Sequence, residues 1–412
     1  MPFSTFKVEN GLTRWFWLTV KTPKDAAAGT YKAAVTITAE NGKDSVLPLE
    51  FTVNKGALDL VDIPAGPFYF GMNVPMNDPE WNEKLNVKSI EKMKEYGMTA
   101  FSSTATIKYS GFKDGSPVLD FSNIDPMMQA ARKAGFTTPV VLYCGGLTGF
   151  NAYYQDTKAM EAAGFKDYSE FLKAVYTPIQ KHGDENNWLP LYFCLGDEPV
   201  DNDVLKSIDN IRAYRKAFPK GPPYFTIFSS FNGSDTNNQH YKLNKEFNCP
   251  SLNGHDEDSI KLLKAAGSDW SFYNNGSRWT YGIYMYKAAK EFDLKWRLSW
   301  HWNICAGDPY YALDCREDDY AWVNSSPDGD LIMTLELERE IRTGLDDYRR
   351  LLTLSRLVKE KSGTAGAIAG QKILDDTMAS FKLGQAGRRQ VYNPEKWKEF
   401  RVSIDKAINE LR

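Results

Sequence analysis

From about residue 66 the sequence alternates short apolar runs with helical patterns, and this alternation constrains the fold more than any other feature. Most segments between the runs have a period of about 3.6 residues, as in 84–96 and 170–181, where apolar side chains share one helix face. Eight such strand–helix units predict a (β/α)8 barrel rather than an open sheet, although the sixth run is short. The eight runs are 67–74, 98–104, 139–146, 189–199, 224–230, 251–254, 270–276 and 296–303.

Helix boundaries between these runs can also be predicted. Asp125 followed by Pro126 is typical of an N-cap with proline in the first turn. Glycines stand where several helices should end, as left-handed residues just past the last turn. These glycines are Gly97, Gly135, Gly183, Gly221 and Gly267.

The two ends of the chain differ from the middle. Residues 13–23 and 29–53 alternate apolar and polar side chains, and Asn41-Gly42 is a hairpin-turn dipeptide. The alternation predicts a buried face on Tyr31, Ala33, Val35 and Ile37, as in a small β-sandwich. The segment is short for a whole sandwich, so it either packs on the next domain or lacks upstream strands. From about residue 330 the pattern is helical. We therefore expect a β-sandwich portion over 1–58, a barrel over 59–345 and a helical C-terminal extension over 346–412.

Composition excludes several classes of protein. The net charge is −3 and no long basic run occurs, so neither nucleic acid nor an anionic membrane is an expected partner. No stretch approaches the roughly 20 apolar residues of a membrane helix. The N-terminus lacks a signal-peptide pattern, and we expect the natural precursor to be exported to the periplasm or the extracellular space. Whether this chain begins after a removed signal stays open from the sequence.

The cysteines and acidic clusters do not predict a metal site or a cofactor. The five cysteines show no CxxC spacing, which disfavours zinc. One Cys305–Cys315 bridge remains open, and Cys144 and Cys194 lie in apolar runs typical of a core. The acidic segment 308–319 lacks the spacing of a calcium loop. We interpret it as a solvated loop or a lid carrying Tyr310 and Tyr311.

The chemistry of a parallel barrel gathers at the C-terminal ends of its strands. Here those ends carry neutral hydrogen-bonding groups, aromatic rings and one acidic pair. A phosphate loop, a GxSxG elbow and a dinucleotide fingerprint are all absent from the sequence. Such a rim suits an uncharged polyhydroxylated ligand, so the expected partner is a glycan or glycoconjugate substrate.

Asp197 and Glu198 form the acidic pair, directly after the apolar run that begins at Leu189. Repulsion between adjacent carboxylates should raise one pKa, so that one group stays protonated while the other is ionised. A proton donor beside a fixed negative charge can break a glycosidic bond. A covalent nucleophile would lie across the sugar, on another strand. An adjacent pair instead suits attack by the substrate's own 2-acetamido oxygen, with Glu198 as general acid/base and Asp197 stabilising the oxazolinium intermediate. The simpler interpretation is that both residues only cap the helix that follows, with Asp201 as its N-cap.

The order of these features resembles glycoside hydrolase family 123. The resemblance rests on a β-sandwich fragment, a barrel with "GDEP" after its fourth strand, and a helical tail entered through "REIRTGLDDYRRL". It implies a β-N-acetylgalactosaminidase that works by substrate assistance, with the family's Asp-Glu pair at Asp197 and Glu198. Relatives carry an Arg-x-Glu-x-x-Arg-x-Gly pattern before the tail. Here Leu337 and Arg339 replace its first Arg and its Glu, whereas Arg342 and Gly344 remain.

Other strand-end residues are candidate sugar contacts. Alternation predicts Trp300 and Trp302 on one face and His301 on the other. The two indoles either contact a sugar or pack between the barrel and its helices, and His301 would bind sugar hydroxyls. Tyr273 could hold the acetamido oxygen, although the Asn-Asn-Gly sequence after it is also typical of a turn. The full set of predicted substrate contacts is Asn73, Tyr143, Ser229, Asn253, His255, Tyr273, Asn274, Arg278, Trp300, His301 and Trp302.

Two alternatives stay open from the sequence. One is a glycosidase for another sugar, with a nucleophile that the sequence does not identify. The other is a non-catalytic carbohydrate-binding barrel that keeps the aromatic residues.

Overall fold

The structure is a computed structural model. It describes residues 9–13, 16, 18–23, 25–40, 42–71, 79–104, 107–143, 154–219, 222–303, 321–325, 329–390 and 392–412. Within them the chain forms two compact units. The larger spans Leu60–Tyr348 and Met378–Val391, and the smaller spans Met1–Asp59, Arg349–Thr377 and Tyr392–Arg412.

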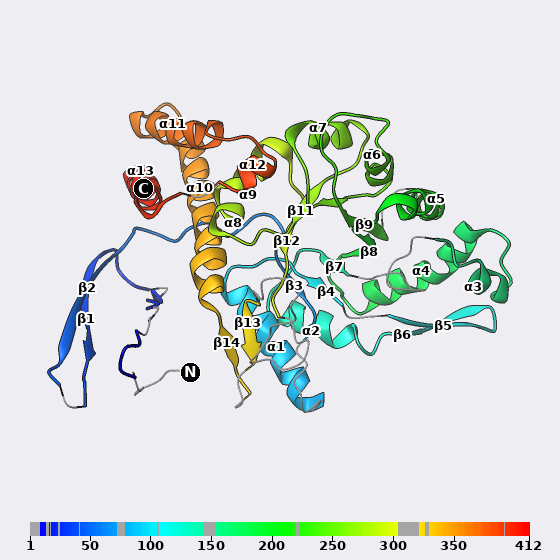
Figure 1. Cartoon of the computed structure of the whole chain (residues 1–412), viewed down its shortest axis with the longest axis horizontal. Coiled ribbons are helices and arrows are strands. Elements are labelled where there is room, and N and C mark those ends of the chain that lie inside the picture. Colours follow the sequence, from blue (N-terminus) through cyan, green and yellow to red (C-terminus); the bar gives the residue numbers. More distant parts are fainter. Residues whose placement is uncertain are drawn as a thin grey trace. The chain divides into compact units, whose positions relative to one another are not determined.

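The larger unit is a closed barrel of eight parallel strands, with helices outside them (Figure 1). Neighbours around the barrel follow the order β3-β4-β7-β8-β9-β10-β11-β12, and β12 pairs with β3 to close it. Seven predicted runs contain a barrel strand and the first, 67–74, overlaps one, so the (β/α)8 prediction is confirmed. The strands are β3 (Ala65–Tyr69), β4 (Ser102–Ser103), β7 (Val140–Leu142), β8 (Leu191–Asp197), β9 (Tyr224–Ser229), β10 (Ser251–Leu252), β11 (Ser271–Tyr273) and β12 (Arg297–Ser299).

Aromatic and aliphatic side chains fill a core among these strands. Phe68 lies in its centre, with its ring centroid 4.8 Å from Phe228 and 5.5 Å from Tyr143. The close approach of β3 to β4 requires a glycine, because a Cβ on Gly66 would lie 1.7 Å from the carbonyl oxygen of Ala100. The interior of this barrel is therefore packed rather than open.

Helices connect the barrel strands. They are α1 (Pro79–Glu95), α2 (Asp125–Lys133), α3 (Thr157–Ala162), α4 (Tyr168–Glu185), α5 (Asp201–Ala217), α6 (Gln239–Asn244), α7 (Glu257–Ala265), α8 (Arg278–Tyr281) and α9 (Ile283–Phe292). Two hairpins interrupt the pattern, β5 (Lys108–Lys113) with β6 (Ser116–Asp120) and β13 (Val323–Ser325) with β14 (Leu331–Met333).

Some predicted helix ends were wrong. Asp125 is the first residue of α2 rather than its cap, and its carboxylate accepts a hydrogen bond from Trp188 Nε1 instead. Gly183 lies inside α4, buried against the indole of Trp188. Gly97, Gly135 and Gly267 do have positive φ angles just past helices, as predicted. Gly221 lies outside the described residues.

The C-terminal helices begin with a π-helix, η1 (Leu337–Arg342). It continues as α10 (Thr343–Glu360), followed by α11 (Ala365–Ala379), α12 (Gln385–Arg388) and α13 (Pro394–Leu411). Gly344 packs at the start of α10, where a Cβ would lie 2.7 Å from the carbonyl oxygen of Arg278. A side chain at this position would push η1 and α10 away from α8.

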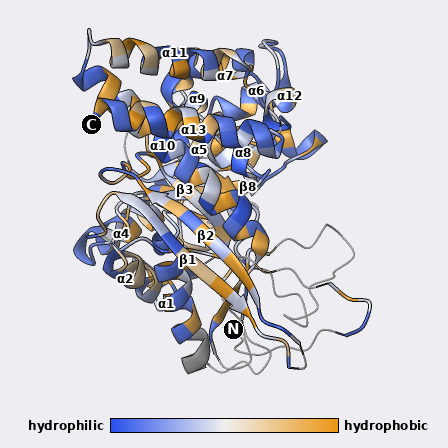
Figure 2. Ribbon diagram, turned by 90° about the vertical axis from the view of Figure 1, so that its left-hand side faces the viewer, coloured by the Kyte–Doolittle hydropathy of each residue, from blue (hydrophilic) through white to orange (hydrophobic). Residues whose placement is uncertain are grey.

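The smaller unit contains a two-stranded antiparallel ribbon of β1 (Gly29–Ile37) and β2 (Ser45–Val53). Hydrophilic and hydrophobic residues are interspersed along it (Figure 2). The predicted buried face was wrong, because Tyr31, Ala33 and Ile37 are exposed and Val35 is only half-buried. Among the described residues of this unit, no second sheet covers that face. The turn residue Asn41 lies outside the described residues.

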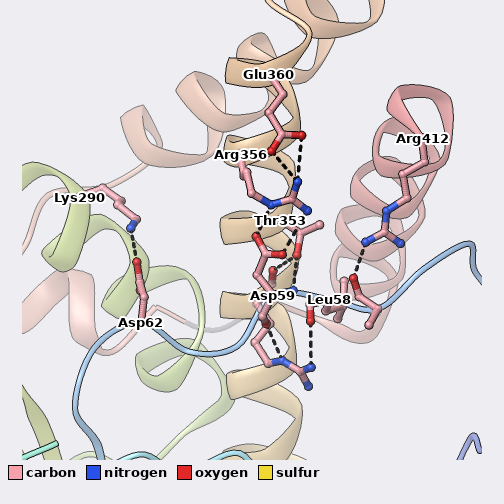
Figure 3. Close-up of polar contacts among 10 residues, drawn as sticks. Leu58, Asp59, Asp62, Lys290, Thr353, Arg356, Glu360 and Arg412 are labelled. Carbon is pink, nitrogen blue, oxygen red and sulfur yellow. Dashed lines mark hydrogen bonds and ion pairs between the residues drawn. The ribbon is translucent and has the colours of Figure 1, made fainter. Parts of the chain in front are cut away.

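Polar contacts join the parts of each unit (Figure 3). In the smaller unit, Arg356 donates to both oxygens of Asp59 at 2.9 and 3.1 Å, and the Asp59 amide donates to Thr353 Oγ1. In the larger unit, Lys290 pairs with Asp62 at 2.8 Å. These contacts fix the chain on either side of residue 60, where the barrel begins.

No described helix is long and apolar enough to cross a membrane. The described residues also contain no group of three or more His, Cys, Asp or Glu side chains placed to hold a metal ion. Cys194 and Cys249 are buried free thiols, while Cys144, Cys305 and Cys315 lie outside the described residues.

Candidate active site

The C-terminal end of β8 is irregular at the point where the two carboxylates stand. The register between β8 and β9 shifts between Cys194 and Asp197, as it does at a bulge. Glu198 then adopts φ 45°, in the left-handed region, while its amide donates to the carbonyl of Phe228 at 2.8 Å. Bulges and positive φ angles redirect side chains that a regular strand would send to opposite faces. Both carboxylates therefore lie at this end of the barrel, where Asp197 and Glu198 contact different neighbours.

Asp197 is half-buried and contacts the neighbouring strand β7. The hydroxyl of Tyr143 donates to its Oδ2 at 2.5 Å. Burial raises the pKa of Asp197, the bond from Tyr143 lowers it, and the charge of Glu198 raises it further. The predicted shift within the pair therefore falls on Asp197, and its main cause is burial rather than repulsion.

Glu198 is exposed, and its contacts come from β10 and β11 rather than from the β7 side of β8. The side-chain amide of Asn253, after β10, donates to its Oε1 at 3.2 Å, and the hydroxyl of Tyr273, at the end of β11, donates to the same oxygen. Burial, followed by the charge of Glu198, raises the pKa of Tyr273, so that its hydroxyl stays a donor. Glu198 is thus oriented by two donors while remaining open to solvent.

Aromatic rings surround the pair. Phe68 and Phe228 lie between the two tyrosines, since Tyr143 and Tyr273 have their centroids 5.6 and 4.9 Å from Phe228. Trp300 is half-buried, with its ring 5.6 Å from Phe68. Phe68 and Phe228 are themselves buried, so of these rings only Trp300 exposes a face that suits the apolar side of a sugar ring.

Two predicted contacts face away from the carboxylates. Ser229 is buried, and its hydroxyl accepts from Asn244 of the outer helix α6, because Phe228 takes the inward position of β9. His255 is fully buried, with Nδ1 against the carbonyl of Leu252 and Nε2 2.7 Å from the Tyr284 hydroxyl. Burial lowers the pKa of His255 to about 3. Both residues were predicted as substrate contacts, and neither is placed to be one.

Arg278 and Trp302 are also placed away from the site. The Arg278 guanidinium pairs with Asp347 of α10 at 2.6 Å, and Asp347 is fully buried. Trp302 has no exposed surface, so it cannot stack on a sugar. The strand β12 ends at Ser299, so strand alternation does not extend over 300–303. His301 is buried against Trp300, with ring centroids 5.0 Å apart.

The remaining predicted contacts have mixed positions. Asn274 and Asn275 both have positive φ angles, as a turn requires, and the Asn274 Oδ1 has no hydrogen-bond partner among the described residues. Asn73 lies outside the described residues. Phe68, Phe228 and Arg388 were not among the predicted site residues. The two phenylalanines are typical of a core, and Arg388 lies far along the chain, where it touches Asn253 and Tyr273.

The arrangement joins one carboxyl with a raised pKa to one solvent-open carboxylate held by two donors. Such a pair can supply a fixed acceptor and a mobile proton at neighbouring points. The raised pKa belongs to Asp197, whereas the sequence assigned the transferable proton to Glu198. At the described strand ends no other carboxylate faces these two: Asp256, the next acid after β10, caps α7 through the Ser259 amide.

No protein-family model matches the chain, and no curated protein matches it. Among solved structures, it is similar to the spore cortex-lytic enzyme SleL of Bacillus cereus, with 11% identity over 56% of this chain and a TM-score of 0.33. The chain spans 54% of SleL. It is similar to the β-mannanase of Thermomonospora fusca in its mannotriose complex (11% identity, 60% of this chain, 80% of the mannanase, TM-score 0.33). It is also similar to tryptophan synthase of M. tuberculosis (10% identity, 58% of this chain, 83% of that chain, TM-score 0.31).

Proposed function

We propose that this protein is a retaining glycosidase that releases β-linked N-acetylgalactosamine or a related 2-acetamido sugar by substrate assistance. The observation that carries the proposal is the pair Asp197 and Glu198 at the end of one barrel strand, in unlike surroundings beside one aromatic surface. An open carboxylate suits proton transfer to and from solvent, and a half-buried carboxylate suits a fixed contact with the substrate.

In the proposed reaction, the acetamido oxygen attacks the anomeric carbon as the glycosidic bond breaks. Glu198 gives its proton to the leaving oxygen, and Asp197 accepts the acetamido N–H and stabilises the positive charge of the oxazolinium. Glu198 then takes a proton from water, which attacks the anomeric carbon and reopens the ring. Two inversions at that carbon give net retention.

The choice of sugar rests on the resemblance to glycoside hydrolase family 123. The two departures from its pattern lie in η1, apart from the carboxylate contacts. Leu337 is fully buried, where an arginine would need a partner, and Arg339 is exposed and pairs with Glu340. The departures therefore bear on how η1 packs rather than on the acidic pair.

A substrate screen tests the proposal. Aryl β-glycosides of N-acetylgalactosamine, N-acetylglucosamine and galactose differ in the acetamido group and in one hydroxyl. We expect release of aryl alcohol from the acetamido sugars, fastest from the galactosaminide. Equal or faster cleavage of the plain galactoside would contradict substrate assistance, and cleavage of none with retained glycan binding would indicate a non-catalytic barrel.

A thiazoline analogue of the oxazoline separates the mechanisms directly. Transition-state and intermediate analogues bind about 10²-fold or more tighter than substrates when the site uses that intermediate. Inhibition by the thiazoline that matches the preferred sugar is therefore expected well below the KM. Failure to inhibit an active enzyme would indicate a separate nucleophile.

A further inference from the structure

A buried arginine contacts both residues that orient Glu198. Arg388 is the last residue of α12 and is 3% exposed. Its Nη2 donates to the carbonyl oxygen of Tyr273 at 2.9 Å and lies 3.5 Å from Oδ1 of Asn253. Tyr273 and Asn253 are the two residues whose side chains donate to Glu198 Oε1. Arg388 thus touches each donor at an atom other than the one that faces Glu198.

The contact with Asn253 matters because an amide has two unlike ends. Its oxygen can only accept and its nitrogen can only donate. A guanidinium beside Oδ1 favours the orientation in which Nδ2 faces Glu198. In the flipped orientation an amide oxygen would face the carboxylate and the amide nitrogen would face Arg388, so both contacts would be repulsive.

Among the described residues, Arg388 has no counter-ion that would explain it as a structural ion pair. No carboxylate of the described residues pairs with it, and its Nε and Nη1 have no hydrogen-bond partner among those residues. Burial lowers the pKa of Arg388 to about 10, so it is still charged at neutral pH. An unpaired buried charge is destabilising, and features that cost stability concentrate at functional sites.

The segment that carries Arg388 is fixed to the barrel. Five backbone groups of 378–388 form hydrogen bonds with side chains of the same unit, and one of these side chains also contacts His255. The pairs are Lys287 Nζ to the carbonyls of Met378 and Phe381, Leu383 N to Glu257, Gly384 N to the Tyr284 hydroxyl that contacts His255, and Trp279 Nε1 to the Gly387 carbonyl. The guanidinium is therefore held from a rigid support.

We propose that Arg388 is a positioning residue for the general acid/base, which holds Asn253 and Tyr273 so that both donate to Glu198. The inference rests on the proposed function, because it assigns Arg388 a part in the proton transfer made by Glu198. It adds to that function a residue from the C-terminal part of the chain.

Leaving-group dependence tests the inference. Protonation by Glu198 matters for an alkyl aglycone and little for 2,4-dinitrophenolate, which departs without a proton. With acetamido glycosides, Arg388→Met should lower kcat/KM about 10²-fold for the alkyl aglycone, the size of effect that misplacement of a reacting group produces. It should change the dinitrophenyl rate by less than about 3-fold, with KM unchanged. A purely structural role would lower both rates alike.

Matched variants complete the experiment. Arg389→Met removes the same charge from the next, exposed residue and should leave both rates unchanged. Arg388→Lys keeps the buried charge but lacks the planar guanidinium. It should give a smaller difference in rate loss between the alkyl and dinitrophenyl substrates, and it replaces Arg388→Met in the test if that variant does not fold. Asn253→Ala combined with Arg388→Met should cost less than the sum of the two, because they act on one contact.

The outcomes distinguish this inference from the proposed function. Glu198→Gln calibrates the split on the same two substrates. If Glu198→Gln shows the split and the Arg388 variants lower both rates equally or neither, the role of Arg388 is wrong and the function stands. If Glu198→Gln itself shows no split, the proposed role of Glu198 fails first.

Discussion

The two ends of β8 carry similar chemistry arranged in different ways. Before the strand, the Asp125 carboxylate accepts from Trp188 Nε1 at 2.8 Å and contacts His182 Nε2 at 3.0 Å. His182 in turn stacks on Phe121, with ring centroids 3.7 Å apart. After the strand, Asp197 and Glu198 accept from Tyr143 and Tyr273. Both ends therefore join carboxylates to aromatic donors.

The difference lies in how the acids are distributed. Asp125 is one acid shared by two donors from the chain that leads into β8, and this links α2 to α4. At the other end two acids lie side by side, although separating them would lower the repulsion. An acid satisfied by several donors stabilises a fold, whereas a close pair of acids suits chemistry.

Glu198→Gln should lower activity more than any other substitution at either end of β8. Gln keeps an oxygen for Asn253 and Tyr273 but cannot transfer a proton. We expect kcat/KM to fall by about 10³-fold or more for an alkyl aglycone, with the melting temperature within about 1 °C of the wild type. Steady-state kinetics and calorimetry measure the two. Full activity would end the assignment of Glu198.

Asp197→Asn should separate activity from stability. Asn still accepts from Tyr143, but it removes a half-buried charge whose pKa is raised by burial and by Glu198. We expect turnover to fall about 10²–10³-fold through loss of electrostatic stabilisation. The free energy of unfolding should stay level or rise by about 0.5–2 kcal/mol, as for other substitutions that relieve an active-site charge. A large loss of stability would show that Asp197 is mainly structural.

Tyr143→Phe should change the pH dependence. The Tyr143 bond lowers the pKa of Asp197, so its removal raises that pKa further. The proposed mechanism needs Asp197 ionised, so activity is present above this pKa and is lost as the pH falls through it. The acid limb of the kcat/KM profile should therefore move to higher pH, with the smallest loss at alkaline pH. Tyr241→Phe, on α6, is the matched control and should leave the limb in place.

The sequence was sufficient for the barrel and for the part of the site that topology dictates. Eight strand ends of a closed barrel meet at one rim, so Tyr143, Asn253 and Tyr273 could be expected near Asp197 and Glu198 before any coordinates. The side of the barrel wall on which each strand residue lies was harder to predict from the sequence. Ser229 and Phe228 are adjacent in β9 and only one can face inward, and a mostly apolar run does not show which.

The remaining differences arise from tertiary contacts. Side chains alternate only within a strand, and β12 ends at Ser299. The direction of the Trp302 side chain therefore could not be predicted from the strand pattern. His255 was assigned by its position after β10, yet the buried hydroxyl of Tyr284 holds it outside the barrel interior. Arg388 is 135 residues beyond Asn253, and no pattern in either segment indicates that they touch.

Asp125→Asn should give the smallest effect on activity and test the other end of the strand. Asn keeps one acceptor for Trp188 and replaces the second carboxylate oxygen with a donor, which weakens the contact with His182. Loss of one hydrogen bond at a half-buried site costs about 1–2 kcal/mol, or about 2–6 °C in melting temperature for a unit of this size. Turnover should stay within about 2-fold of the wild type. If Asp125→Asn lowered turnover as strongly as Asp197→Asn, the contrast would be false, since acids at both ends of β8 would then act on the reaction.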